Sequence, residues 1–269
     1  DEFIKRISCD VILIDHHQPQ TITQKNVYYY NPEVEGKQKP TTAICYEIVN
    51  QNSWIAMTGT TGDWHYDKKI AKDFQKDFPD YIDAKLTKAP DILFTTKIGE
   101  LVKIIAFNLK GKITEVKKSI KVFTRIESPD EILDKKTPAG TFIYKKYKKM
   151  NVLYEELKKE VLAQKNETLF LEHISTNQQV SFSSELSNEI LYLCPEKVII
   201  IGRTSGGNTK GSVRTALDID LRPAIEESTQ GIGYGGGHDK ACGFCVEDEH
   251  FHIFLEKFKA KIEEIVEEK

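Results

Sequence analysis

The stretch VILIDHHQPQ, residues 11–20, decides the fold class of the first part of this chain. Four aliphatic residues run directly into Asp15, His16 and His17, and a proline follows two positions later. An uninterrupted apolar run of this kind predicts a parallel strand that is covered on both faces. Ligands of open α/β sheets bind beyond the carboxyl ends of the strands, so the three side chains are expected to face a binding crevice.

The chemistry of this triplet suits a metal site. Two imidazoles and a carboxylate are ligands that favour Mn²⁺ or another borderline divalent ion. The alternative is a polar strand end that faces solvent. From these residues alone, both interpretations stay open.

A second candidate ligand follows in TGTTGDW, residues 58–64, where Asp63 comes directly after a helix expected over 54–61. The glycines and threonines of that helix would let its backbone approach another element closely. The alternative is an aspartate that ends a helix in a turn. His65 and Asp67 are near enough in sequence to be rival ligands.

The pattern of elements changes along the chain. Strands are expected over 9–14 and 26–30, a helix capped by Thr41 and Thr42 follows, and the lysine-rich stretch 68–164 has helical spacing. After residue 166 strands and helices alternate again: strands over 168–173, 197–202, 210–217 and 242–246, and helices over 184–193 and from 251 to 265. These changes predict two α/β domains that separate near residue 165.

The later part holds a glycine cluster, Gly235-Gly236-Gly237-His238, with Ala241 and Gly243 behind it. Three successive glycines can expose a run of backbone N–H groups in the geometry of an anion-binding nest. His238 adds a hydrogen-bond donor at its edge. The alternative is a flexible turn between two strands.

Ser212 and Arg214 fall on one face of the strand expected over 210–217, since side chains alternate along a strand. Both could therefore meet one phosphate. Only five of the 38 basic residues are arginines, so each planar guanidinium is a candidate for such a role. The alternative is a surface strand with a solvated arginine.

Composition excludes several classes of protein. The net charge of −3 excludes a general nucleic-acid coat protein, and five cysteines argue against a disulfide framework. No apolar run reaches the roughly 18 residues that cross a bilayer, and no signal peptide is visible, so we expect a cytoplasmic protein without a membrane partner.

Taken together, the motifs resemble those of a known family. A strand ending in DHH, a Gly-Asp about 48 residues later, SVR at 212–214 and GGGHxxAxG at 235–243 occur in the order typical of the DHH phosphoesterases. More narrowly, the chain resembles members with the RecJ and nano-RNase type of carboxyl-terminal domain. Asn31-Pro32 also fits, and the resemblance covers nearly the whole chain. Type II pyrophosphatases share the first domain but end differently, without GGGH.

The resemblance implies an α/β fold: a parallel-sheet DHH domain (1–140), a helical connector (141–165) and a smaller mixed-sheet domain (166–269). It implies two divalent ions, Mn²⁺ or Mg²⁺, that activate a water for attack on phosphorus. The residue roles that it implies are as follows: His16 and Asp63 as metal ligands, His17 facing the scissile phosphate, Asp15 orienting the cluster, and Ser212, Arg214, Gly235, Gly236, Gly237 and His238 holding the nucleotide.

The implied reaction is Mn²⁺-dependent hydrolysis of short single-stranded oligonucleotides or dinucleotides to nucleoside monophosphates, in a cleft between the two domains. The family's remaining ligands precede the DHH strand, where this sequence has fourteen residues, so we expect an incomplete DHH domain with impaired activity. The chain is then either part of an enzyme or a non-catalytic module that binds nucleotides or a protein. The joint presence of DHH, Asp63, Arg214 and GGGH favours the enzyme. The motifs do not specify whether the substrate is RNA or DNA, from which end it is cleaved, or the oligomeric state of the protein.

Overall fold

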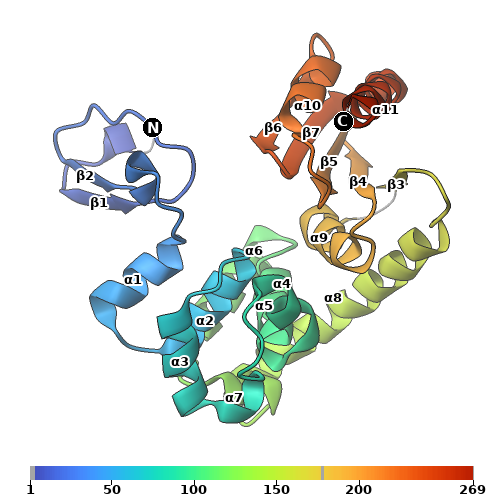
Figure 1. Ribbon diagram of the computed structural model, residues 1–269. Helices are drawn as coiled ribbons and strands as arrows, with labels where there is room; N and C mark the ends of the chain where they lie inside the picture. The colour runs from blue at the N-terminus through green and yellow to red at the C-terminus, as the bar shows by residue number, and fades with distance from the viewer. Residues whose placement is uncertain (1–3, 177–178, 269) are drawn as a thin grey trace. The chain divides into compact units, whose positions relative to one another are not determined.

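The computed structural model describes residues 4–176 and 179–268 (Figure 1). The chain forms two compact units. The first unit holds the residues up to Ala106 together with Phe123–Tyr144, and the second unit holds Phe107–Val122 and the residues from Lys145 on. Each unit is described by itself.

The first unit contains a two-stranded parallel sheet of β1 (Val11–Ile14) and β2 (Val27–Tyr30). Ile12 pairs with Tyr28, and alternation places Tyr30 on the same face. This face is open in the described part of the chain, with Ile12 75% exposed and Tyr28 61% exposed. The strand is therefore parallel, as predicted, but the expectation that both of its faces are covered is wrong, because an apolar run does not say what packs on it.

Helices make up the rest of the first unit, in agreement with the helical spacing after residue 68. They are α1 (Thr41–Val49), α2 (Ser53–Gly62), α3 (Lys68–Asp77), α4 (Ala89–Thr95), α5 (Lys97–Asn108), α7 (Pro129–Leu133) and the start of α8 (Pro138–Ala163), with short 3-10 turns η1 (Ile4–Arg6), η2 (Pro32–Glu35) and η3 (Pro79–Tyr81). A Cβ on Gly59 would lie 2.5 Å from Oγ1 of Thr42, so α2 packs tightly on α1 because Gly59 lacks a side chain.

The start of α1 differs from the prediction. Thr41 and Thr42 are the first helical residues, and Pro40 occupies the cap position without a side-chain hydrogen bond. Pro40 has φ −59° and ψ 146°, the extended conformation that precedes a helix, and the N–H of Thr41 lies 3.3 Å from Nδ1 of His16. The hydroxyl of Thr41 is therefore available for another partner.

The second unit is built on a five-stranded sheet. Its strands are β3 (Phe170–Ser175), β4 (Val198–Ser205), β5 (Asn208–Thr215), β6 (Gly233–His238) and β7 (Ala241–Glu247), in the order β3-β4-β5-β7-β6. Only the β3–β4 pair is parallel, so the sheet is mixed, and the predicted fold class is confirmed. The glycine cluster, expected as a nest or turn, instead forms the edge strand β6.

The helices of the second unit are α6 (Ile113–Phe123), the rest of α8, α9 (Ser183–Leu193), α10 (Arg222–Thr229) and α11 (Phe251–Glu267), with the 3-10 turn η4 (Asp248–His250). One face of the sheet joins α10 and α11 in a core that includes Ile200, Val213 and Phe254. The other face carries α9 over β4 and β5. Within the described residues, no helix has the length and apolar character needed to cross a membrane.

Candidate functional site

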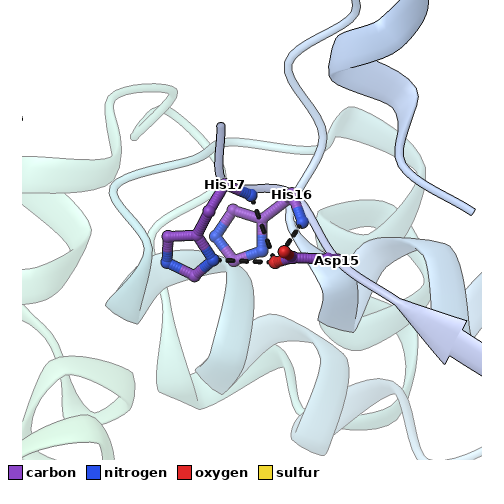
Figure 2. A group of neighbouring side chains, drawn as sticks. All are labelled: Asp15, His16 and His17. Atoms are coloured by element: carbon purple, nitrogen blue, oxygen red, sulfur yellow. Dashed lines mark hydrogen bonds and ion pairs between the residues drawn. The ribbon is translucent and has the colours of Figure 1, made fainter. Parts of the chain in front are cut away.

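Asp15 organises the end of β1 through its own hydrogen bonds (Figure 2). Its Oδ1 accepts from the backbone N–H of His16 at 2.8 Å, from that of His17 at 3.2 Å, and lies 2.8 Å from Nδ1 of His17. The contact with the His17 ring is the main cause that lowers the pKa of the Asp15 carboxyl. The carboxylate therefore fixes the ring of His17 and leaves its Nε2 directed outward.

His16 is oriented by the first residue of α1. Its Nδ1 lies 2.9 Å from Oγ1 of Thr41, and its Nε2 lies 4.0 Å from Oδ2 of Asp63. When Nδ1 carries the proton and donates to Thr41, the lone pair of Nε2 is free for a metal ion. The backbone N–H of Thr41 also lies 3.3 Å from Nδ1, and it would donate a hydrogen bond to Nδ1 in the other tautomer, in which Nδ1 carries no proton.

The distance between Nε2 of His16 and Oδ2 of Asp63 fits two ligands of one small divalent ion. Such an ion lies about 2.1 Å from each ligand atom, so its ligands can be up to about 4.2 Å apart. The donor set, one imidazole and one carboxylate, suits Mn²⁺ or Mg²⁺. In residues 4–176 and 179–268, no third ligating side chain lies within 4.8 Å of both.

The rival ligand Asp67 has a different role. Its Oδ1 accepts hydrogen bonds from the backbone N–H groups of Lys69 and Ile70, both at 2.9 Å, and so caps α3. This cap satisfies two of the N–H groups that a helix start leaves unpaired. Asp63 therefore remains the aspartate of this segment that faces His16.

Four of the candidate residues of the second unit, Ser212, Arg214, Gly236 and His238, share one face of the sheet. The register aligns Ser212, Gly243 and Gly236 in one row across β5, β7 and β6. The next row aligns Arg214, Ala241 and His238. Side chains of directly paired residues point to the same side, and this side is the one opposite α10 and α11. We call the floor formed by Gly236, Ala241 and Gly243 the glycine shelf.

The glycine shelf is open above its surface. A Cβ on Gly236 would meet nothing within 4 Å, and one on Gly243 would lie 3.6 Å from the carbonyl oxygen of Gly211. Gly235 faces the other way, where a Cβ would lie 2.5 Å from Cγ2 of Ile225 on α10. The nest prediction is therefore wrong in conformation, because pairing with β7 extends the glycines and turns alternate residues to opposite faces.

Arg214 borders the glycine shelf and is held rigidly. Its Nε donates to Oδ1 of Asn188 at 2.8 Å, and its Nη1 donates to the carbonyl oxygens of Val213 at 2.9 Å and Cys242 at 3.0 Å. Nη2 lies 3.5 Å from Oγ of Ser184. Burial lowers the pKa of this guanidinium. The alternative of a solvated surface arginine is wrong.

Two positioning residues were missed by the sequence analysis. Thr41 was interpreted as a cap, and Asn188 was not singled out within its helix. Both act through a long-range hydrogen bond, to His16 and to Arg214 respectively. For Thr41, the sequence offered one signal of this role, a hydroxyl directly after a proline. For Asn188, the sequence offered no signal.

Comparisons with known proteins bear on the fold of the chain. Residues 166–268 match the model of the DHHA1 domain. No curated protein matches the chain. RecJ from Thermus thermophilus, solved with Mn²⁺, superposes with a TM-score of 0.65 at 14% identity, over 97% of this chain and 42% of RecJ.

Two further structures are similar. An exonuclease RecJ bound to manganese gives a TM-score of 0.59 at 16% identity, over 97% of this chain and 70% of that protein. The pGpG-specific phosphodiesterase PggH from Vibrio cholerae gives a TM-score of 0.55 at 12% identity, over 98% of this chain and 87% of PggH. The chain spans less than half the length of the Thermus RecJ.

The chain is therefore an α/β protein with the fold of the DHH family of phosphoesterases. Within it, residues 166–268 match the DHHA1 domain. The resemblance that the DHH and GGGH motifs indicated is confirmed at the level of the fold and of this domain.

Proposed function

We propose that this protein is a Mn²⁺-dependent phosphodiesterase that hydrolyses short single-stranded oligonucleotides or dinucleotides to nucleoside monophosphates. The observation that carries the proposal is the 4.0 Å approach of His16 Nε2 to Asp63, with Thr41 orienting the ring from behind. Structures of the same fold support it, since the two RecJ proteins bind manganese and PggH acts on pGpG.

The first unit supplies the groups around phosphorus. His16 and Asp63 would hold a divalent ion, and Asp15 keeps His17 in place through the hydrogen bond to Nδ1. A bound divalent ion lowers the pKa of a coordinated water and neutralises charge on the phosphate. His17, whose side chain is 69% exposed, presents its Nε2 to a phosphate oxygen.

The second unit carries its own set of groups suited to the phosphate of a nucleotide. Arg214 keeps its charge and a fixed plane, which suits a phosphate better than a mobile lysine would. Ser212 and His238 add hydrogen-bond donors on the same face of the sheet. The glycine shelf carries no large side chain, so a ligand can approach its backbone closely. Substrate phosphate or a terminal nucleotide would rest there.

A non-catalytic nucleotide-binding module is the second candidate. The observation that favours it is that, among the described residues, His16 and Asp63 have no third ligand within 4.8 Å of both. Two protein ligands bind a hard divalent ion weakly, and the family reaction needs two ions.

Hydrolysis of 5′-phosphorylated RNA and DNA of two to eight nucleotides, with Mn²⁺ and with EDTA, separates the two candidates. For the enzyme we expect monophosphate release that falls about 100-fold or more in His16→Ala and in His17→Ala. His252→Ala, an exposed histidine on α11, is the matched control and should keep full activity. Nucleotide binding that is independent of metal, without hydrolysis, would favour the module, and neither binding nor hydrolysis would overturn both.

A further inference from the structure

A cavity with a volume of about 580 Å³ lies in the second unit. The loop between α5 and α6 supplies Lys110 and Lys112, the segment before α9 supplies Gln179 and Ser181, and the end of β4 supplies Arg203. These residues are distinct from those of the glycine shelf. Among the residues that line this cavity in the described part of the chain, three are cations and none is a carboxylate.

Lys110 is fixed in the wall of this cavity. Its Nζ lies 2.8 Å from Oε1 of Glu185 and 5.9 Å from the centre of the Phe182 ring, and its side chain is only 21% exposed. Lys112, by contrast, is exposed on the loop. The hydroxyl of Ser181 and the amide of Gln179 add neutral donors to the cationic ones. This combination of a guanidinium, ammonium groups and neutral donors suits a phosphate.

The cavity and the glycine shelf lie on the same face of the sheet. Arg203 pairs with Lys210, and alternation along β5 puts Lys210 on the side of Arg214. The first turn of α9 contacts both sites, because Ser184 lies near Arg214 while its neighbour Glu185 binds Lys110. Sheet dimensions put Arg203 and Arg214 about 14 Å apart, which is one strand across and four residues along.

We propose that this cavity is a second phosphate subsite, which takes a backbone phosphate of a single-stranded oligonucleotide whose end lies at the glycine shelf. A separation of about 14 Å corresponds to about four nucleotides at the rise of a stacked strand, and to fewer when the strand is extended. The inference rests on the proposed function, since it assumes that the shelf holds a nucleotide. It gives the protein a preference for oligonucleotides over dinucleotides.

Fluorescence anisotropy with 5′-phosphorylated oligonucleotides of two, four, six and eight residues, in EDTA to prevent hydrolysis, tests this subsite. We expect the wild type to bind the hexamer and octamer more tightly than the dinucleotide. In Lys112→Ala/Arg203→Gln we expect about 10-fold weaker binding of the long oligonucleotides and less than about 2-fold change for the dinucleotide. The slope of log affinity against log salt should fall in magnitude by about 0.7, the effect of one phosphate contact on a single strand.

The controls separate the possible failures. Lys257→Ala removes an exposed lysine on α11 and should leave every affinity unchanged, and Lys112→Ala alone tests the subsite without altering β4. A dinucleotide that binds as tightly as the octamer would overturn the subsite and leave the proposed function intact. Absence of all binding would overturn the subsite, while the hydrolysis assay with Mn²⁺ decides the proposed function separately. Binding of inorganic phosphate can be measured by calorimetry. If the double variant loses this binding but keeps its oligonucleotide affinities, the cavity is a site for the free ion, and the proposal of an oligonucleotide subsite is overturned.

Discussion

The two candidate sites are positioned by different means. At the end of β1, Asp15 holds the backbone and ring of its own neighbours, on a sheet of two strands whose Ile12 is 75% exposed. Arg214 instead lies on a sheet of five strands, whose core includes the fully buried Ile200 and Val213. The first site is thus organised by hydrogen bonds, mostly local ones from Asp15 together with the contact between His16 and Thr41, and the second by the rigidity of a packed sheet.

The largest effect expected from this difference is on stability, when one substitution is made in each sheet. Ile200→Ala removes a side chain that is 0% exposed and should lower the free energy of unfolding by about 2–5 kcal/mol. Ile12→Ala, on the open face of β1, should change it by no more than about 0.5 kcal/mol. Urea denaturation followed by circular dichroism measures both. Equal losses in the two variants would show that β1 is packed as firmly as β4 and would end the comparison.

A smaller effect is expected within the glycine cluster, where neighbouring residues face opposite ways. Gly235→Ala places a Cβ 2.5 Å from Cγ2 of Ile225 and should cost about 1–3 kcal/mol by overpacking. Gly236→Ala meets open space and should leave stability unchanged within about 0.5 kcal/mol. Thermal unfolding of the two variants tests the assignment of faces. If Gly236→Ala were the more destabilising of the two, Gly236 would face α10, and the glycine shelf would not lie on the open face of the sheet.

The next prediction concerns the rigidity of Arg214. Arg214→Lys keeps the charge but loses the fork that bonds Asn188 and the carbonyl oxygen of Cys242. A lysine is a mobile point charge, so we expect dinucleotide affinity to fall about 10-fold. Anisotropy measures this change, and Arg222→Lys, at an exposed arginine paired with Asp220, is the matched control. Wild-type affinity in Arg214→Lys would mean that charge alone suffices.

Much of this architecture could be predicted from the sequence, because local patterns carry it. The apolar run before Asp15 predicted a parallel strand, and the strands and helices expected after residue 166 are present as β3, α9, β4, β5, β7 and α11. The position of Asp63 after a helix of small residues was also correct. In each case the information lies in residues that are close together along the chain.

The rest depended on contacts between distant residues. Glycines are typical of turns, and only pairing with β7 makes Gly235 to Gly237 an extended edge strand. The link between Thr41 and His16 spans 25 residues, and that between Arg214 and Asn188 spans 26. No periodicity or motif reports such a bond, so the residues that position the candidate site were found only in the structure.

The smallest effect expected concerns what stabilises the first unit in place of a large sheet. Tyr81 donates a hydrogen bond to Asp130, and Nζ of Lys136 lies 2.9 Å from its other oxygen. The bond from Tyr81, and then the contact with Lys136, lower the pKa of the Asp130 carboxyl. Because the folded pKa is depressed, this carboxylate stabilises the fold above its unfolded pKa of about 3.9, and the contribution is lost as the pH falls through the lower folded value.

Asp130→Asn should therefore lower the free energy of unfolding by about 1 kcal/mol at pH 7, since the pair is partly exposed and its contribution is screened by solvent. The difference from the wild type should shrink below about pH 4, where this carboxylate takes up protons in the unfolded chain before it does so in the folded protein. Asp80→Asn, at an exposed aspartate nearby, should show no effect at either pH. Urea denaturation at pH 7 and at pH 3 compares each of the two variants with the wild type. A loss in Asp130→Asn that persists undiminished at pH 3 would mean that the shape of the side chain, and not its charge, holds α7 against Tyr81, and that the first unit depends on packing in the same way as the second.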